Sequence, residues 1–285
     1  MTQRKLPAHI EAALAGNVAD SAGRPWEGRD LSGEGNPLHA FDKDDGGIPP
    51  AYEKAVRDLV AGRSDEAAVV RALARIRVFV PVIAELGGAD SAEDPVPDTH
   101  SHGDKEADMA LVTIKAPDGR RALPVFTSTA QLERWHPDAR PVAVYAARAA
   151  LAAVAEKAEL MVVDPGADVT FVVRRPALWA LAQQKEWAPS YSDPALARLL
   201  GDAAAPNESI RRVEAAPGAG VSSRTANGTV IGGGGAGPEL LLTLVLREGL
   251  TQEAVRSTVQ AFQSRLQNLQ DFVERVDSLE IRLSR

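Results

Sequence analysis

The sequence of 285 residues contains no cysteine. This absence excludes disulfide frameworks, thiolate metal sites and cysteine nucleophiles. Basic residues are also fewer than acidic ones: the sequence has 32 Lys and Arg against 39 Asp and Glu, which gives a formal net charge of −7. An acidic balance is the opposite of the basic surface typical of nucleic-acid-binding proteins. We therefore expect no nucleic acid as a partner.

Long apolar runs are absent as well. The most apolar longer stretch, residues 141–155, contains Arg148 and is shorter than the roughly 18 apolar residues needed to span a bilayer. The first 16 residues carry Arg4, Lys5 and Glu11 and no uninterrupted apolar run of the kind found in signal peptides. We expect a cytoplasmic chain that does not bind membranes.

Length and composition are those of an ordinary globular protein. Hydrophobic residues make up 45% and charged residues 25%. At roughly 150 residues per domain, the length favours two domains. Four segments are expected, namely an N-terminal helix and Gly/Pro-rich arm (1–48), a mixed sheet domain (49–200), a flexible linker (201–237) and a C-terminal β-α-β unit (238–285).

Residues 78–185 alternate between short β-branched runs and helix-like apolar stripes, which predicts an α+β fold with a mixed parallel and antiparallel sheet flanked by helices. Ser64 and Ser128 are expected to be helix N-caps. Pro81 lies inside a strand-like run and favours an edge strand or a bulge there. Asp118-Gly119 predicts the turn of a hairpin. The expected helices are 51–60, one following Ser64, 129–135, 147–158 and one beginning at Pro176, and the expected strands are 78–83, 109–115, 121–126, 142–145, 160–163 and 169–173.

The C-terminal segment predicts strand, helix and strand at 239–246, 252–276 and 279–283. Apolar residues recur in the helix at spacings of three and four, so one helix face must be buried. A unit of this size cannot bury that face well alone and should dock on the main domain or on a second subunit. A homodimer through this helix is therefore predicted.

One short stretch offers candidate metal ligands. His100, His102 and Asp104 form an H-x-H-x-D pattern, and imidazoles two residues apart with a carboxylate can bind zinc or iron. The next residue, Lys105, departs from the pattern of metallo-β-lactamase-like hydrolases, and nothing apolar flanks the loop to pre-organise ligands. We favour a solvated loop and expect no metal and no cofactor.

Other catalytic motifs are missing. The run Gly232-Gly233-Gly234-Gly235 could bind phosphate through its N–H groups, but it precedes Pro238 and a strand instead of leading into a helix. No serine lies in a G-x-S-x-G elbow, and no H-E-x-x-H occurs. We therefore assign no catalytic residue and expect a protein that is not an enzyme.

Candidate binding residues lie instead where strands end. Phe126-Thr127-Ser128 forms a strand-to-helix corner and Asp164-Pro165-Gly166 forms a turn, and mixed α/β sheets tend to place their sites at the carboxyl ends of strands. Trp26 lies in a Gly/Pro-rich segment, where its ring either anchors the arm or contacts a partner. The candidate binding residues are Phe126, Thr127, Ser128, Asp164, Gly166 and Trp26.

These residues resemble a known family. The stretches 109–113 and 118–128, with Leu132 and Trp135, are similar to the N-terminal domain of SseB-like proteins, named for enhanced serine sensitivity. The similarity continues through Asp164-Pro165-Gly166 and the Pro176 helix, and the segment from Trp26 to Gly46 looks like the actinobacterial form. The resemblance implies no established catalytic activity and no catalytic residues. It also implies a connection with serine or amino-acid metabolism.

Two functional hypotheses follow. The first is a non-enzymatic protein-interaction or regulatory module with an unknown protein partner. The alternative is a small-ligand-binding or metal-dependent enzyme that uses His100, His102 and Asp104.

Overall fold

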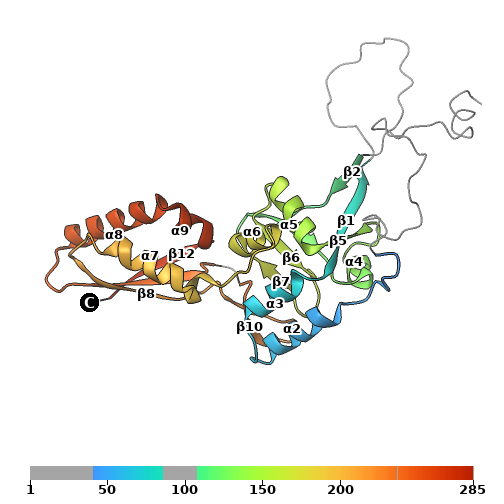
Figure 1. The fold of residues 1–285 in the computed structure, drawn as a ribbon, viewed down its shortest axis with the longest axis horizontal. Coiled ribbons are helices and arrows are strands. Elements are labelled where there is room, and N and C mark those ends of the chain that lie inside the picture. Colours follow the sequence, from blue (N-terminus) through green and yellow to red (C-terminus); the bar gives the residue numbers. More distant parts are fainter. Residues whose placement is uncertain (1–40, 86–107, 236, 285) are drawn as a thin grey trace, which may run out of the picture. The chain divides into compact units, whose positions relative to one another are not determined.

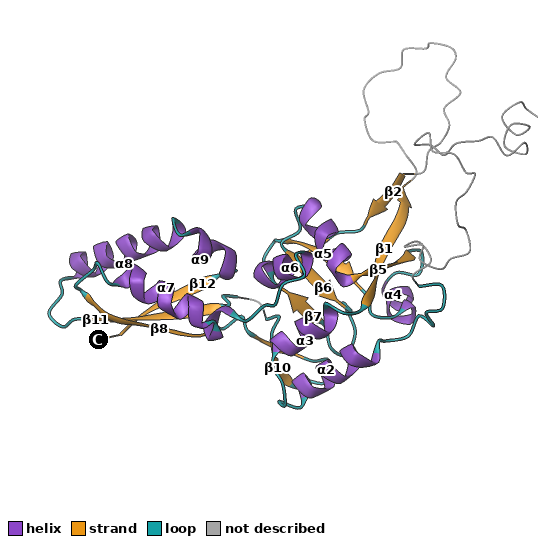
Figure 2. Ribbon diagram, viewed as in Figure 1, coloured by secondary structure: helices purple, strands orange, loops and turns teal. Residues whose placement is uncertain are grey.

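The computed structural model describes residues 41–85, 108–235 and 237–284, hereafter the described part of the chain (Figures 1 and 2). Two hydrophobic cores organise this part. The first core extends from Tyr52 to Leu181 and includes Ile231. The second extends from Leu196 to Val276. No helix of the described part is long and apolar enough to cross a membrane.

The first core is built on a four-stranded sheet with the order β3-β4-β6-β7. Its strands β4 and β6 are parallel, whereas the two outer pairs are antiparallel. The expected mixed sheet and α+β class are therefore confirmed. The bounds are β3 (Ile114–Lys115), β4 (Arg121–Val125), β6 (Leu160–Val163) and β7 (Phe171–Val173).

A second, antiparallel sheet adjoins the first and has the order β2-β1-β5. A single bridge between Phe79 and Phe126 connects the two sheets. The bounds are β1 (Arg77–Glu85), β2 (Asp108–Leu111) and β5 (Arg140–Tyr145).

Pro81 lies in the central strand β1, so the edge strand or bulge expected there is wrong. It stands opposite Pro141 of β5, while the pairing of β1 with β2 begins only at Val82. Two opposed prolines fit the non-hydrogen-bonded position of an antiparallel pair, where neither residue would donate an N–H to the other. The central position therefore costs no hydrogen bond between these two strands.

The predicted Asp118-Gly119 turn is confirmed. Gly119 has φ +90°, and its N–H donates to the carbonyl of Ala116 at 2.9 Å. The turn connects β3 to β4. The first strand of the predicted hairpin is shorter than expected, because residues 108–111 leave this sheet and pair with β1 as β2.

Helices surround these sheets where the sequence predicts them. They are α2 (Pro50–Val60), α3 (Glu66–Leu73), α4 (Thr129–Trp135), α5 (Ala146–Ala155) and α6 (Arg175–Ala182). The N-cap of α3 is Asp65, whose carboxylate accepts the N–H of Ala68 at 3.0 Å, so the assignment to Ser64 is off by one residue.

The second core lies between a three-stranded sheet and helices on one face of it (Figure 1). The order is β12-β11-β8, with β11 and β12 parallel, so the predicted β-α-β connection is confirmed. The predicted single helix is instead two helices: the first ends at Gln267 with Asn268 as its C-cap, and a second short helix follows Leu269, whose backbone is extended. The bounds are α7 (Pro194–Ala204), β8 (Ile210–Pro217), β11 (Leu240–Leu246), α8 (Gln252–Gln267), α9 (Gln270–Arg275) and β12 (Leu279–Ser284).

The flexible linker predicted over 201–237 is wrong. This segment contains the end of α7, the whole of β8, and the hairpin of β9 (Ser222–Arg224) and β10 (Val230–Gly232). Its glycine-rich end is fixed by Arg174, whose Nη2 donates to the carbonyls of Gly220, Gly235 and Gly237 at 2.8, 2.6 and 3.2 Å. A partner that lies far away in the sequence therefore orders a segment that has no periodicity of its own.

The apolar face of α8 packs inside the chain. Phe262 and Leu266 are buried against Leu240, Leu242 and Leu244 of β11. This face was the reason for predicting a homodimer through the helix. That reason no longer holds, and the homodimer itself stays an untested prediction.

Candidate binding site at the ends of β4 and β6

The carboxyl ends of β4 and β6 meet at one edge of the sheet because the two strands are parallel neighbours. Phe126, Thr127 and Ser128 follow β4, and Asp164 follows β6. The buried Phe126 exchanges two backbone hydrogen bonds with Phe79, at 2.7 and 2.8 Å. The structure therefore brings together the two segments that the sequence singled out.

Thr127 and Asp164 form the centre of this corner. The backbone N–H and the Oγ1 hydroxyl of Thr127 each donate to one carboxylate oxygen of Asp164, both at 2.7 Å. The N–H of Asp164 donates to the carbonyl of Val125 at 2.8 Å. Asp164 has φ +52°, a left-handed conformation that Asp tolerates better than most residues. These bonds lock the turn after β6 to the turn after β4.

Asp164 is only 3% exposed. Burial raises its pKa to about 6, although the two hydrogen bonds from Thr127 act in the opposite direction. A carboxyl group with this pKa changes its charge close to neutral pH.

Two further contacts fix the chain after Thr127. The Ser128 hydroxyl accepts the N–H of Gln131 at 3.2 Å, so the predicted N-cap of α4 is confirmed. The guanidinium of Arg77 donates to the carbonyls of Thr127 and Gly47 and lies 4.3 Å from the centre of the Phe79 ring. The polar atoms of Thr127 and Ser128 are therefore engaged in holding the corner.

A groove runs along α4 beside this corner and is formed by two cavities of about 220 Å³ each. Both cavities are lined by Gln131, Arg134 and Ala167, and we call them together the α4 groove. The first adds Trp135, Pro165 and Gly166, and the second adds Ile48, Tyr52, Glu53, Val56, Asp164, Asp168 and Val169. Of the sequence candidates, Asp164 and Gly166 therefore line the groove.

Sequence reasoning missed Tyr52 and Arg134. Tyr52 was assigned only to an apolar stripe, yet its buried hydroxyl has no hydrogen-bond partner within the described part of the chain. Burial and the charge of Asp164 raise its pKa. Arg134 is exposed and precedes Trp135, whose ring centre is 5.2 Å from that of Phe126. An arginine beside a tryptophan at the end of the helix that follows β4 was the available signal.

The remaining sequence candidates are not placed. Trp26, His100, His102 and Asp104 lie outside the described residues, so the metal-dependent alternative is untested. Among residues 41–85, 108–235 and 237–284 there is no group of three His, Asp or Glu side chains that could hold a metal ion.

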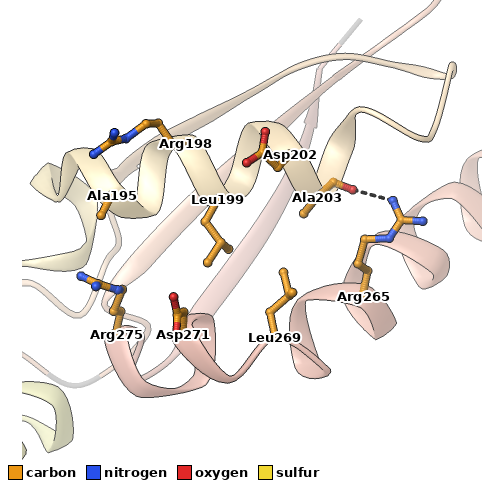
Figure 3. Close-up of a pocket in the computed structure, with 9 residues that line it drawn as sticks. All are labelled: Ala195, Arg198, Leu199, Asp202, Ala203, Arg265, Leu269, Asp271 and Arg275. Carbon is orange, nitrogen blue, oxygen red and sulfur yellow. Dashed lines mark hydrogen bonds between the residues drawn. The ribbon is translucent and has the colours of Figure 1, made fainter.

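A separate cavity of about 420 Å³ lies between α7 and the break from α8 to α9. Figure 3 shows Leu199 and Leu269 projecting into the space between the helices, with charged side chains around them. The Arg265 guanidinium donates to the carbonyl of Ala203 at 2.9 Å and connects the two walls. None of the sequence candidates lies here.

Comparison with protein families gives a match for the segment that contains most of the first core. Residues 53–180 match the SseB protein N-terminal domain. The chain carries an SseB N-terminal domain. The resemblance inferred from the sequence is thereby confirmed for this segment, which includes Thr127, Asp164 and Arg134. The strands and helices of the second core follow the matched segment, and comparison with curated proteins gives no match.

Proposed function

We propose that the SseB domain of this chain is a non-enzymatic protein-interaction or regulatory module that works in the cytoplasm and receives its partner in the α4 groove. The observation that carries this proposal is the position of Arg134 between the two cavities of the groove. It is exposed and has no hydrogen bond or ion pair to any described residue. A guanidinium with five free donors in such a place is suited to a partner's carbonyl or carboxylate oxygens.

The neighbours of Arg134 support the same function. Trp135 is half-buried at one end of the groove, and Ile48, 40% exposed, lies at the other. Tryptophan and arginine are enriched among the residues that dominate binding energy at protein interfaces. Apolar and planar side chains on either side of a cation favour a protein segment that presents an apolar side chain beside an oxygen acceptor.

The corner beneath the groove supports a rigid receptor surface. Thr127, Asp164, Ser128 and Arg77 fix the ends of β4 and β6 through hydrogen bonds to one another and to the backbone. A pre-organised surface loses less conformational entropy when a partner binds. A link to serine or amino-acid metabolism is part of the proposal and is supported by the family resemblance alone.

Affinity capture with matched variants tests this function. The bait would be the wild-type chain, Arg134→Ala, Ile48→Asp, and the control Val230→Asp, which alters an exposed apolar residue, 54% exposed, outside the groove. A partner captured by wild type and control should be lost from both groove variants. Its dissociation constant, measured with the purified partner, should rise about tenfold or more in those variants. Partners retained equally by all four baits would disprove the role of the groove.

A further inference from the structure

A cavity of about 280 Å³ lies between the C-terminal ends of α3 and α6. One wall is α3 with the turn that follows it, where Ala67, Arg71 and Ala74 recur at spacings of four and three and so share one side of the helix. The other wall is the end of α6 with residues 184–187. None of its lining residues lines the α4 groove, so this cavity is a separate site.

The floor of the cavity is apolar and belongs to the first core. Val70 and Leu181 line the cavity and are buried members of that core, and the half-buried Trp187 packs against it. The turn that leads from α6 into the second wall is held by the N–H of Lys185, which donates to the carbonyl of Ala180 at 2.8 Å. The cavity is therefore formed before any ligand binds, and a pre-organised site loses less conformational entropy on binding.

The rim of the cavity carries three cations and one anion. Arg71 and Arg75 come from the first wall, Lys185 and Glu186 come from the second, and all four are exposed. The side chains of the three cations make no hydrogen bond or ion pair within the described part of the chain. No acidic residue lies three or four positions from either arginine, so the ion pair usual on a helix surface is not available to them. Two positive charges in excess therefore line the cavity without a counter-charge from the described residues.

We propose that this cavity binds an organic phosphate monoester, whose anionic group lies among Arg71, Arg75 and Lys185 and whose apolar part rests on the floor. A phosphate monoester carries a charge of about −1.5 to −2 at pH 7, which matches the excess of positive charge. The planar guanidinium group also fits phosphate oxygens through paired hydrogen bonds. The volume is just below the usual range for small-molecule sites, which limits the apolar part to about the size of one aromatic ring. The proposal is independent of the α4 groove.

Isothermal titration calorimetry of the full chain with phenyl phosphate tests the site. The variants Arg71→Glu and Lys185→Glu reverse one charge on each wall, and Ala74→Trp fills the cavity. The control, Arg256→Glu, reverses an exposed charge on α8, outside the cavity. We expect the dissociation constant of phenyl phosphate to rise about tenfold in each charge-reversal variant, saturable binding to be lost in Ala74→Trp, and the control to equal wild type. Arg71 and Lys185 are exposed, so their variants remain informative where the tryptophan variant does not fold.

Analogues of phenyl phosphate identify the ligand chemistry. Phenyl sulfate has nearly the same shape with one negative charge, inorganic phosphate lacks the apolar part, and benzyl alcohol lacks the charge. Each should bind about fivefold or more weakly than phenyl phosphate. Added sodium chloride should weaken the binding of phenyl phosphate more than that of benzyl alcohol. A peptide with one phosphotyrosine, compared with phenyl phosphate, distinguishes a modified protein side chain from a free small molecule as the source of the phosphate.

Three results would overturn the proposal. The first is no measurable binding of phenyl phosphate to the wild-type chain. The second is an unchanged dissociation constant in both Arg71→Glu and Lys185→Glu. The third is equal affinity of the wild-type chain for phenyl phosphate and benzyl alcohol, because the cations would then contribute nothing to binding.

Discussion

Thr127 saturates both carboxylate oxygens of Asp164, one through its backbone N–H and one through its hydroxyl, and both residues are almost completely buried. A buried carboxylate oxygen that loses its partner pays its full desolvation penalty. The pair therefore stabilises the fold because its loss would leave a buried carboxylate oxygen without a hydrogen-bond partner.

Replacing Thr127 by Val tests this relationship because the shape is kept and only the hydroxyl is lost. We expect the free energy of unfolding, measured with urea, to fall by about 1–3 kcal/mol. Thr243→Val is the control, since Thr243 lies on β11 and its side chain makes no hydrogen bond to any described residue. The control should change stability by less than about 0.5 kcal/mol. Equal effects in both variants would mean that the pair is not special.

Glu66 makes stability depend on pH. Burial raises its pKa to about 7, the hydrogen bond from Tyr191 lowers it, and the nearby charges of Glu239 and Asp65 raise it while Arg174 lowers it. A carboxyl group with a raised pKa binds its proton more tightly in the folded state. Its stabilising contribution is therefore complete below pH 4.5 and is lost as the pH rises to about 7.

Glu66→Gln should remove this part of the pH dependence. Between pH 4.5 and pH 8, wild type should lose about 3 kcal/mol more of its free energy of unfolding than the Gln variant loses. Tyr191→Phe removes a hydrogen bond that favours the charged form of Glu66, so the pKa of Glu66 should rise further. The free energy of unfolding of this variant should therefore continue to fall up to a higher pH than that of wild type. Urea denaturation at a series of pH values measures both, and parallel curves for wild type and Glu66→Gln would contradict the assignment.

The elements with strong local patterns were predicted well. Helix α4 follows an N-cap serine, the β3–β4 turn contains Asp-Gly, and β6 is a short run of buried apolar residues. The corner at Thr127 and Asp164 could be predicted because parallel neighbours end at the same edge. These features depend on residues close in sequence or on a general rule of sheet topology.

Features that depend on distant partners were not predicted. Arg174 donates hydrogen bonds to carbonyls as far along the chain as Gly237. Asp277 accepts hydrogen bonds from Arg174 and Arg120, both of which are more than 100 positions away in the sequence. Tyr52 lies on an apolar stripe, and only the fold places its hydroxyl near Asp164. Neither periodicity nor turn chemistry carries information about such contacts, so the ordered segment 201–237 and the lining of the α4 groove required the structure.

Asp277 should be indispensable for stability. Its side chain is 1% exposed and accepts from Arg174 at 2.8 Å and from Arg120 at 2.9 Å, while the Arg174 side chain is 6% exposed. Asp277→Asn would leave a buried guanidinium without its counter-charge, which costs about 3–5 kcal/mol. Glu280→Gln, which breaks the exposed pair with Arg282, is the control and should cost less than about 1 kcal/mol. Urea denaturation of the two variants measures this difference. Urea is uncharged, so unlike guanidinium chloride it does not screen the ion pairs.

A substitution at Gly235 tests whether residues 201–237 form an ordered segment or a flexible linker. An alanine in a flexible linker would stabilise slightly, whereas here its Cβ would collide with the Ser222 carbonyl oxygen. We expect Gly235→Ala to lower the melting temperature. The control is Gly201→Ala within α7, where nothing lies within 4 Å of an added Cβ and alanine should stabilise by roughly 0.5–1 kcal/mol. A rise in melting temperature for both variants would restore the linker interpretation.

Phe262 decides whether α8 serves the chain's own core or a second subunit. It is 2% exposed and packs with Leu266 against β11, so Phe262→Ala should cost about 3–5 kcal/mol. If the packing is internal, the melting temperatures of wild type and variant should not change with protein concentration. A dimer held by this helix face would instead melt at higher temperature when more concentrated, since association stabilises the folded state by mass action. Calorimetry over a hundredfold range of concentration separates the two cases, and a concentration-dependent wild type that becomes concentration-independent in Phe262→Ala would establish the dimer.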